Sequence, residues 1–202
     1  FADYDAVAAL QEKIKEDGRV GNYIYTTYWG IFGLTAAGAD VEPQIAWLLT
    51  QQNADGSFGS YGTETGDSGD ADNTAASIMA LRAAGIPADD PAVEAAVQFL
   101  REAIEENGGY NYGYYSAPNL ASTAWAVQAF CSVGIDPSTV KSSAGNSPVD
   151  YLLSLQKEDG SFRYTETLTD TPVGMTARAV AALAGCAYPI LPGAQGFDIK
   201  GG

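Results

Sequence analysis

The sequence predicts an all-α protein built from four helical hairpins, and two repeated observations carry that prediction. A run that opens with Thr, is rich in Ala and reaches a small residue about three helical turns later occurs at residues 27–38, 74–85, 123–134 and 176–187. A Gly turn followed by an aliphatic or aromatic residue precedes each run, at residues 18–20, 55–58, 107–110 and 159–162. Self-similarity with a period of roughly 50 residues indicates stacked supersecondary units.

The first helix of each later hairpin is predicted to begin at a proline. Pro43, Pro91 and Pro148 each follow an acidic or polar residue, which is a standard helix start. The segments that follow carry apolar residues at helical spacing, and Val7 and Leu10 give the first unit an equivalent. These helices should be amphipathic, with one face toward solvent.

The Thr-led helices differ because they are apolar nearly all round, as residues 74–81 and 123–130 illustrate. A helix of this kind is buried on most sides, and its final Gly ends it in a left-handed conformation. Each unit is therefore an outer helix, a Gly turn, a variable loop and an inner helix. Four units give eight helices, with the inner helices ringed by the outer ones in a small or partial α/α toroid.

The toroid domain is predicted to span residues 1–188. Residues 189–202 have the Pro and Gly content of a C-terminal cap or linker. Alternation typical of a strand occurs at residues 110–115, where a short hairpin would fit.

Composition excludes several classes of function. Ten Lys and Arg face 25 Asp and Glu, a net charge of −15, which argues against nucleic acid or anionic membrane as a partner. No apolar run approaches the ~20 residues of a membrane span. The chain has no His, so every mechanism that uses imidazole is excluded. Cys131 and Cys186 lack a C-x-x-C pairing and are interpreted as buried small hydrophobes, with a disulfide between adjacent units as the alternative.

Two segments resemble the prenyltransferase and squalene-cyclase repeat, in which a Leu-Leu-x-x-Gln run precedes Asp-Gly-Ser and an aromatic residue. These segments are residues 47–59 and 151–162. The resemblance covers most of the chain and implies the α/α toroid of terpenoid cyclases, protein prenyltransferase β subunits, complement thioester domains and cobalamin carriers. Since those relatives do very different things, the fold alone does not select a function. The zinc site of the prenyltransferases and the Cys-Gly-Glu-Gln thioester motif are both missing from this sequence.

Residues 70–75, Asp-Ala-Asp-Asn-Thr-Ala, resemble the Asp-x-Asp-Asp-Thr-Ala signature of class II terpene cyclases. The resemblance implies that Asp72 is a general acid that protonates an alkene or epoxide, with Asp70 as a supporting carboxylate. Such an acid keeps its proton until use, which requires a partly desolvated carboxyl beside another carboxylate. Asn73 replaces the third Asp and supplies no charge. The alternative is that Asp72 or Asn73 caps the inner helix.

A third interpretation of this loop is a calcium site. Closely spaced oxygen ligands on Asp67, Asp70 and Asp72, in a loop that contains Gly, suit Ca²⁺, although the spacing does not match an EF-hand. No other cofactor is indicated.

Aromatic residues are the second candidate site. Two groups occupy equivalent places in the third and first units: Tyr110, Tyr112, Tyr114 and Tyr115, and Tyr25, Tyr28 and Trp29. If the loops at one end of the toroid converge, these rings line a pocket mouth for a small molecule, a glycan or a protein ligand. The alternative is that the Tyr alternation buries one ring of each pair against neighbouring loops.

Two functions remain open. The first is a non-catalytic ligand- or partner-binding toroid module of a secreted or cell-surface protein, favoured by the missing His, by Asn73, by the acidity and by the linker-like C-terminus. The alternative is an enzyme, a class II terpene cyclase of the squalene type or a fragment of one, with Asp72 as general acid.

Overall fold

The computed structural model describes residues 4–61, 68–113, 116–193 and 195–200, and over these residues the protein is helical with no strands. The inner helices are α2 (Ile24–Ala36), α4 (Ala71–Ala83), α6 (Leu120–Ser132) and α8 (Pro172–Leu183). The outer helices are α1 (Ala6–Gln11), α3 (Glu42–Thr50), α5 (Pro91–Glu102) and α7 (Pro148–Ser154), with a short 3₁₀ helix, η2 (Pro137–Thr139), before α7. The predicted all-α class and the eight helices are confirmed.

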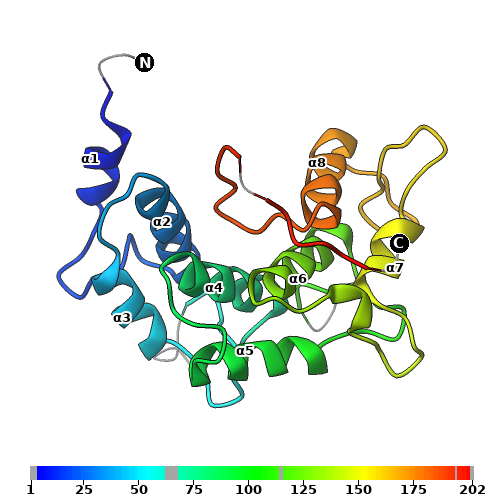
Figure 1. Ribbon diagram of the computed structural model, residues 1–202, viewed down its shortest axis with the longest axis horizontal. Coiled ribbons are helices and arrows are strands. Elements are labelled where there is room, and N and C mark those ends of the chain that lie inside the picture. The colour runs from blue at the N-terminus through cyan, green and yellow to red at the C-terminus, as the bar shows by residue number, and fades with distance from the viewer. Residues whose placement is uncertain (1–3, 62–67, 114–115, 194, 201–202) are drawn as a thin grey trace.

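The four units follow one another along an open arc. Figure 1 shows the inner helices in succession along the arc, with α3, α5 and α7 on its convex side. The fold is therefore a partial α/α toroid. Among the described helices, none has both the length and the apolar character needed to cross a membrane.

The outer helices begin where the prolines predict. Pro91 and Pro148 are the first residues of α5 and α7, and Pro43 is the second residue of α3. The residue before Pro91, Asp90, caps α5 by accepting a hydrogen bond from the N–H of Ala92 at 2.9 Å.

The inner helices begin three or four residues before the Thr that was predicted to open them. Each Thr instead ties its helix to the Gly turn of its own unit. Its hydroxyl accepts a hydrogen bond from the backbone N–H of the residue after the turn, at 2.9 to 3.1 Å. The pairs are Thr27 with Val20, Thr74 with Phe58, Thr123 with Tyr110 and Thr176 with Phe162. We call these bonds the threonine ties.

In three units the inner helix ends just before the predicted Gly. Gly38, Gly85 and Gly134 adopt positive φ directly after their helices. In the fourth unit the terminal Gly is Gly185, with φ of 68°, and the prediction of Ala187 was wrong because α8 already ends at Leu183.

The predicted hairpin at residues 110–115 reduces to a single bridge. Tyr110 pairs with Asn119, and the second unit has the equivalent pair of Phe58 with Asp70. Each of these two bridges joins the residue after a Gly turn to the residue that caps the following inner helix, so the second and third units share this feature.

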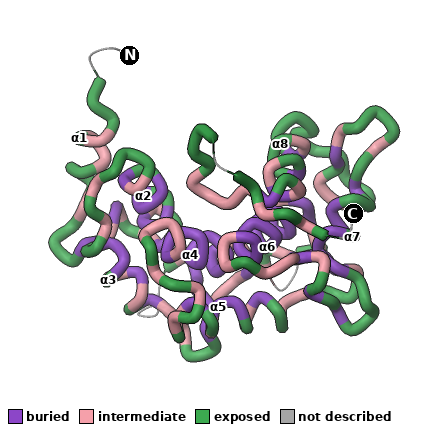
Figure 2. The backbone as a smooth tube through the Cα atoms, in the orientation of Figure 1, coloured by how far each residue is buried: buried purple, intermediate pink, exposed green. Residues whose placement is uncertain are grey.

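The core lies between the inner and outer helices. Figure 2 shows α4 and α6 buried along most of their length, as their nearly all-apolar sequences predict. One apolar cluster joins α2, α3, α4, α5 and α6, and a second joins α6, α7 and α8. Cys131 and Cys186 are free thiols, and burial raises the pKa of Cys131 to about 12, which disfavours a nucleophilic role.

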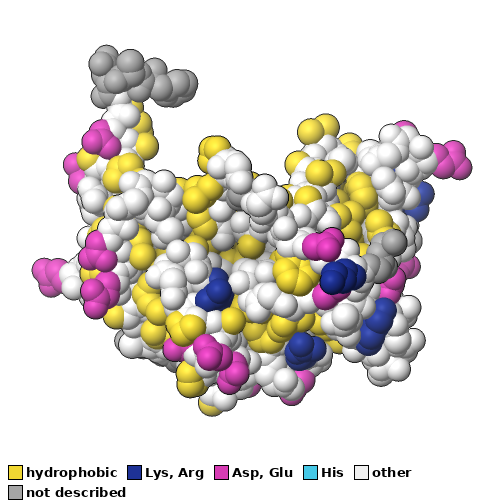
Figure 3. Space-filling view, viewed as in Figure 1, with side chains coloured by type: hydrophobic (Ala, Val, Ile, Leu, Met, Phe, Trp, Pro, Cys, Tyr) yellow, Lys and Arg dark blue, Asp and Glu magenta, His cyan; other side chains and the backbone are white. Residues whose placement is uncertain are grey.

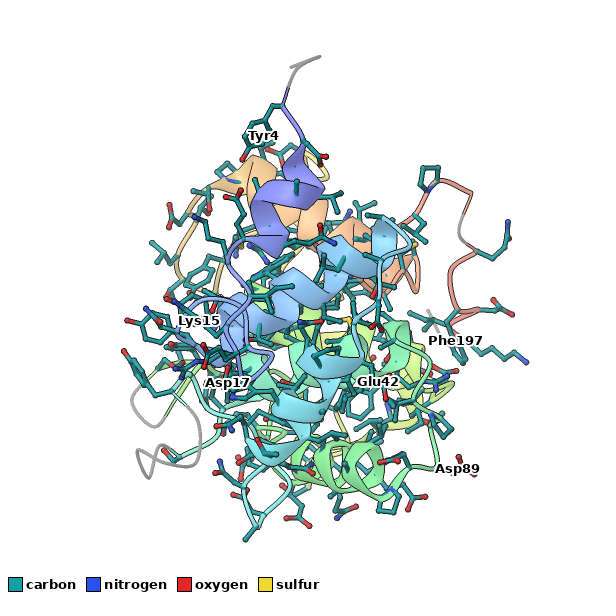
Figure 4. The ribbon with its side chains drawn as sticks, turned by 90° about the vertical axis from the view of Figure 1, so that its left-hand side faces the viewer. Tyr4, Lys15, Asp17, Glu42, Asp89 and Phe197 are labelled. Carbon is teal, nitrogen blue, oxygen red and sulfur yellow. The ribbon has the colours of Figure 1, made fainter. Side chains whose placement is uncertain are left out.

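Residues 184–193 and 195–200, called here the C-terminal strap, cross the open side of the arc between α2 and α8 (Figure 1). Phe197 and Ile199 pack against the second core cluster, and Phe197 is labelled in Figure 4. Ser138 Oγ donates to the carbonyl of Lys200 at 2.6 Å, and the N–H of Lys200 donates to Asp136 at 3.0 Å. The strap is thereby anchored beside η2.

Candidate functional site

The inner helices turn equivalent residues toward the concave side of the arc. These residues lie two before, two after and five after the Thr of each threonine tie, a spacing that keeps them on one helix face. They include Tyr25, Trp29 and Phe32 in α2, Asp72, Ala76 and Met79 in α4, Trp125 and Gln128 in α6, and Arg178 in α8. The strap packs on this face, since Gln128 donates to the carbonyl of Cys186 at 2.6 Å and Met79 lines one hollow with Tyr188.

Five rings form a cluster on the concave side, which we call the concave aromatic cluster. They are Tyr28, Trp29, Phe32, Trp125 and Tyr188. The ring centroids of Trp29 and Trp125 lie 5.8 Å apart, and the Tyr188 ring lies 5.6 Å from the first and 5.3 Å from the second. Trp29 is 47% exposed, so the cluster remains open to solvent on the α2 side. It joins two inner helices and the strap into one apolar wall.

Asp72 lies at the edge of this wall, in the first turn of α4. Its Oδ1 is buried and accepts no hydrogen bond from any residue that the structure describes. Burial raises the pKa of Asp72 to about 6, although a hydrogen bond with Ser122 lowers it; nearby Asp70 raises it further and Arg178 lowers it. Ser122 belongs to α6 and Arg178 to α8, so residues of two other inner helices act on this carboxyl.

Tyr28 connects the acid to the aromatic wall. Its ring lies 6.4 Å from Trp125, and burial followed by the charges of Asp72 and Asp70 raises its pKa. A carboxylic acid that keeps its proton near pH 6 beside an apolar wall can act as a hydrogen-bond donor or as a general acid.

Asp70 has the structural role that was predicted for Asp72 or Asn73. It is the N-cap of α4, and its Oδ1 accepts a hydrogen bond from the N–H of Asn73 at 2.8 Å. Asn119 caps α6 in the same way, so the capping prediction was right in kind and wrong in residue.

Asn73 supports this cap with its side chain. Its Nδ2 donates to Asp70 Oδ2 at 2.6 Å and to Ser60 Oγ at 3.1 Å. An Asp at this position would set a second carboxylate against Asp70, so the amide that replaces the third Asp of the motif suits the capping geometry.

Asp70 also faces a different space from Asp72. It lines a hollow of about 460 Å³ that Tyr112, Glu102 and Glu105 share, and Asp72 is not part of that lining. The charge of Asp70 therefore affects the pKa of Asp72, but the two carboxyls do not line the same pocket.

The predicted tyrosines separate into core and surface residues. Tyr110 is fully buried and its hydroxyl donates to the carbonyl of Leu100 at 2.8 Å, so the prediction that it lines a pocket mouth was wrong. Tyr112 is exposed, which is the alternation expected if one ring of each pair is buried. Tyr114 and Tyr115 lie outside the described residues.

Tyr25 lies in the first turn of α2, and Tyr112 lies in the loop of the third unit. Tyr25, stacked on Tyr23 with centroids 4.9 Å apart, and Tyr112 both lie near enough to Tyr28 to raise its pKa. Of the predicted aromatic residues, Tyr28 and Trp29 belong to the concave aromatic cluster, while Tyr25 and Tyr112 flank it.

The calcium interpretation depends on Asp67, which lies outside the described residues. Within the described ranges, no three side chains of His, Cys, Asp or Glu are grouped so as to hold a metal ion. Calcium binding stays a prediction.

The sequence interpretation missed Trp125, Phe32, Tyr188, Ser122 and Arg178. A signal for one of them was present, because Trp125 follows Thr123 by two positions just as Trp29 follows Thr27. Aligning the units on their Thr residues places both indoles on the same face. Tyr188 had no such signal, since it lies outside the repeat.

Comparison with known proteins agrees with this architecture. The family model for the squalene-hopene cyclase C-terminal domain matches residues 5–122, and that for the prenyltransferase alpha-alpha toroid domain matches residues 75–195. The chain belongs to the squalene-cyclase and prenyltransferase toroid family. The resemblance seen in the repeat sequences is thereby confirmed.

Relatives within this toroid family include bacterial cyclases. The chain is 36% identical over 138 residues to a probable squalene–hopene cyclase of Sinorhizobium fredii, covering 61% of this chain and 20% of that protein. It is 35% identical over 143 residues to the squalene–hopene cyclase of Zymomonas mobilis, covering 65% and 20%. The chain thus spans about a fifth of the length of these relatives.

A solved structure shares the fold. Candida albicans protein geranylgeranyltransferase-I, in complex with GGPP, superposes with a TM-score of 0.62 and 16% identity, covering 81% of this chain and 49% of that chain. At this identity the similarity supports the α/α toroid alone.

Proposed function

We propose that the concave aromatic cluster binds a neutral, apolar small molecule of the isoprenoid class beside Asp72. The observation that carries the proposal is the wall of five rings, with Trp29 open to solvent and Ala76 and Met79 between the two tryptophan helices. A concave, mostly apolar surface with few polar groups is typical of a small-molecule site. The relatives are named squalene–hopene cyclases, and squalene is a hydrocarbon of this class.

The surroundings favour a neutral ligand over a charged or sugar-like one. A net charge of −15, with Asp72 at one end of the wall, opposes a diphosphate. Four of the eight ring pairs in the cluster pack edge to face, as in the 72° angle between Trp29 and Trp125, so the cluster is not a flat platform on which a sugar would stack. The proposed role is that of a binding module, and a secreted or cell-surface location remains part of this proposal.

Tryptophan fluorescence tests the binding role. Titration with geranylgeraniol should shift and saturate the emission of Trp29 and Trp125, and Trp125→Ala should weaken binding at least tenfold, because its ring contacts three others in the cluster. Trp47→Phe, on outer helix α3, is the matched control and should leave the affinity unchanged. Equal affinity in all three proteins would contradict the proposal.

A second candidate function is acid catalysis, favoured by the raised pKa of Asp72 and its uncommitted Oδ1. The protonated carboxyl would transfer its proton to one carbon of an alkene, leaving a carboxylate on Asp72 and a cation on the neighbouring carbon. Ring faces of Trp29 and Trp125 would stabilise that cation, and loss of a proton from the product would restore the acid.

Product analysis separates the two functions. The chain is incubated with squalene, and cyclised product is sought by mass spectrometry, with Asp72→Asn as the control. Product that disappears in Asp72→Asn supports catalysis. Binding of geranylgeraniol without any product supports the binding module alone.

A further inference from the structure

Each inner helix carries an apolar stripe that packs against the next unit, and in α8 this stripe is exposed. Residues three before, one after and four after the tie Thr are buried in the first three inner helices, at most 7% exposed. They are Ile24, Tyr28 and Ile31, then Ala71, Ala75 and Ile78, then Leu120, Ala124 and Val127. In α8 the equivalents are Val173, Ala177 and Val180, and all three are exposed, Val173 by 85% and Val180 by 57%. We call these three residues the α8 stripe.

The Gly turns show the same difference. A Cβ at Gly18, Gly56 or Gly108 would clash with a carbonyl oxygen at the start or first turns of the next outer helix, whereas a Cβ at Gly160 would meet nothing within 4 Å. The missing neighbour at Gly160 is therefore an outer helix.

A glutamine four residues before the turn Gly, present in the second and fourth units, indicates how that helix would be held. Gln52 donates to the carbonyl of Gly56 at 2.9 Å and also to Ala92 in α5 at 2.8 Å. Gln156 occupies the equivalent place and donates to the carbonyl of Gly160. A groove of about 560 Å³ lies here, lined by Lys157, Asp159, Ser161, Pro172, Val173, Thr176 and Ala177. Figure 3 shows hydrophobic side chains gathered over the end of the arc that carries α8.

The N-terminal end of the arc carries the other half of this contact. Inner helices α4, α6 and α8 each pack against the preceding inner helix. The residues at this contact lie one before, three after and six after the tie Thr. Most of them are small, such as Ala126 and Ala129 in α6. The same positions in α2 are Thr26, Gly30 and Gly33, of which Gly33 is exposed, Thr26 is half-buried and Gly30 is buried against Val20 of its own unit. Figure 4 looks onto this end, where α1 lies beside α2.

We propose that a second copy of this chain docks its first unit, α1 and α2, on the α8 stripe and the Gly160 turn of the first copy. The described residues of the strap carry no helix and run back to η2, so they do not supply the missing outer helix. The α8 stripe and the first unit correspond to the two surfaces that meet wherever one unit packs on the next, a contact that the fold makes three times. Such a head-to-tail interface joins different surfaces and extends or closes into a ring.

Sedimentation velocity over a range of protein concentrations tests this proposal. Each copy carries a charge of −15, so measurements are made at ~0.15 and ~0.5 M salt to screen repulsion between copies. We expect dimers and larger species that grow with concentration. Val180→Asp, Gly160→Ala and Gly33→Asp should each weaken association at least tenfold, whereas Ala46→Asp, on the exposed face of α3, should not.

Mixing the edge variants identifies the geometry. Val180→Asp keeps an intact N-terminal edge and Gly33→Asp keeps an intact α8 edge, so an equimolar mixture should form a heterodimer and no larger species. Circular dichroism verifies that each variant is folded, and Gly160→Ala probes the α8 edge without adding a charge. A monomer at every concentration and both salts would overturn the proposal, and so would association that Val180→Asp and Gly160→Ala leave unchanged.

Discussion

Asp72 shows how one carboxyl in the first turn of a helix is set apart from its neighbours. Asp70, two residues earlier, has both oxygens engaged by Asn73, whereas Asp72 Oδ1 is buried without a hydrogen bond from the described residues. The consequence is an acid whose charge is costly in the folded state, so that its pKa is raised to about 6.

This cost predicts a pH dependence of stability. Unfolded Asp has a pKa of about 3.9, so the folded protein binds the extra proton between about pH 4 and pH 6, and stability contributed by Asp72 is full below pH 4 and lost as pH rises through 6. Asp72→Asn should remove this loss and raise the free energy of unfolding near pH 7 by on the order of 2 to 3 kcal/mol. Urea unfolding at several pH values measures it.

Asp70→Asn is the matched control for that experiment. Asn119 already caps α6 with the same geometry, so an amide at position 70 keeps the cap of α4. The control should retain the pH dependence between about pH 4 and 6. If Asp72→Asn shows the same pH profile as the wild type, the raised pKa of Asp72 is contradicted.

At the scale of elements, the threonine ties explain why Thr recurs in each unit. The hydroxyl of Thr74 satisfies the N–H of Phe58, a fully buried residue, and thereby fixes the inner helix to its own turn. Because each unit has such an N–H to satisfy, each unit has a Thr hydroxyl at the same position of its inner helix.

Thr74→Val should therefore destabilise the protein. The substitution keeps the shape and leaves the buried N–H of Phe58 without an acceptor, which costs about 1 to 3 kcal/mol. Thr176→Val is the matched comparison, and its effect should be smaller because Thr176 is half-buried and water can reach the turn. Thermal and urea unfolding give both values, and equal losses would contradict the explanation.

The Gly turns give a second prediction at this scale. Gly56 and Gly160 have φ of 86° and 82°, so Ala costs about 1 kcal/mol in backbone strain at either position. Gly56→Ala should cost more than Gly160→Ala, because only the former meets a carbonyl of the next outer helix. Unfolding measured in dilute, low-salt solution, where single copies prevail, gives the comparison. A larger loss for Gly160→Ala would show that the packing at the two turns is not as described.

At the scale of the whole molecule, the C-terminal strap closes part of the concave face. Tyr188 packs against Trp29, Phe32 and Trp125, so one residue of the strap covers the apolar wall that the inner helices build. Tyr188→Ala should increase acrylamide quenching of tryptophan emission, because both indoles lose a covering ring. Tyr4→Ala, at the far N-terminal end, should leave quenching unchanged.

The features that recur in every unit could be predicted from the sequence. Pro91, the Gly turns and the Ala-rich runs are local signals, so the helices, their order and their inner or outer placement follow from them. The cap was predicted at Asp72 or Asn73, two or three residues after Asp70, because Asp and Asn occupy three of four neighbouring positions and each can cap a helix. Tyr188 was not predictable, since its place in the site depends on a strap that folds back across the arc.

The succession of units along the arc also determines which helices unfold first. The inner helices pack in succession, α2 on α4, α4 on α6 and α6 on α8, so the contacts between inner helices join residues about one unit apart in the sequence. α4 and α6 are flanked on both sides, whereas α8 has one neighbour and an exposed stripe. Amide protons of α8 should therefore exchange with solvent through partial opening of that end, while those of α4 and α6 exchange only when the whole arc unfolds.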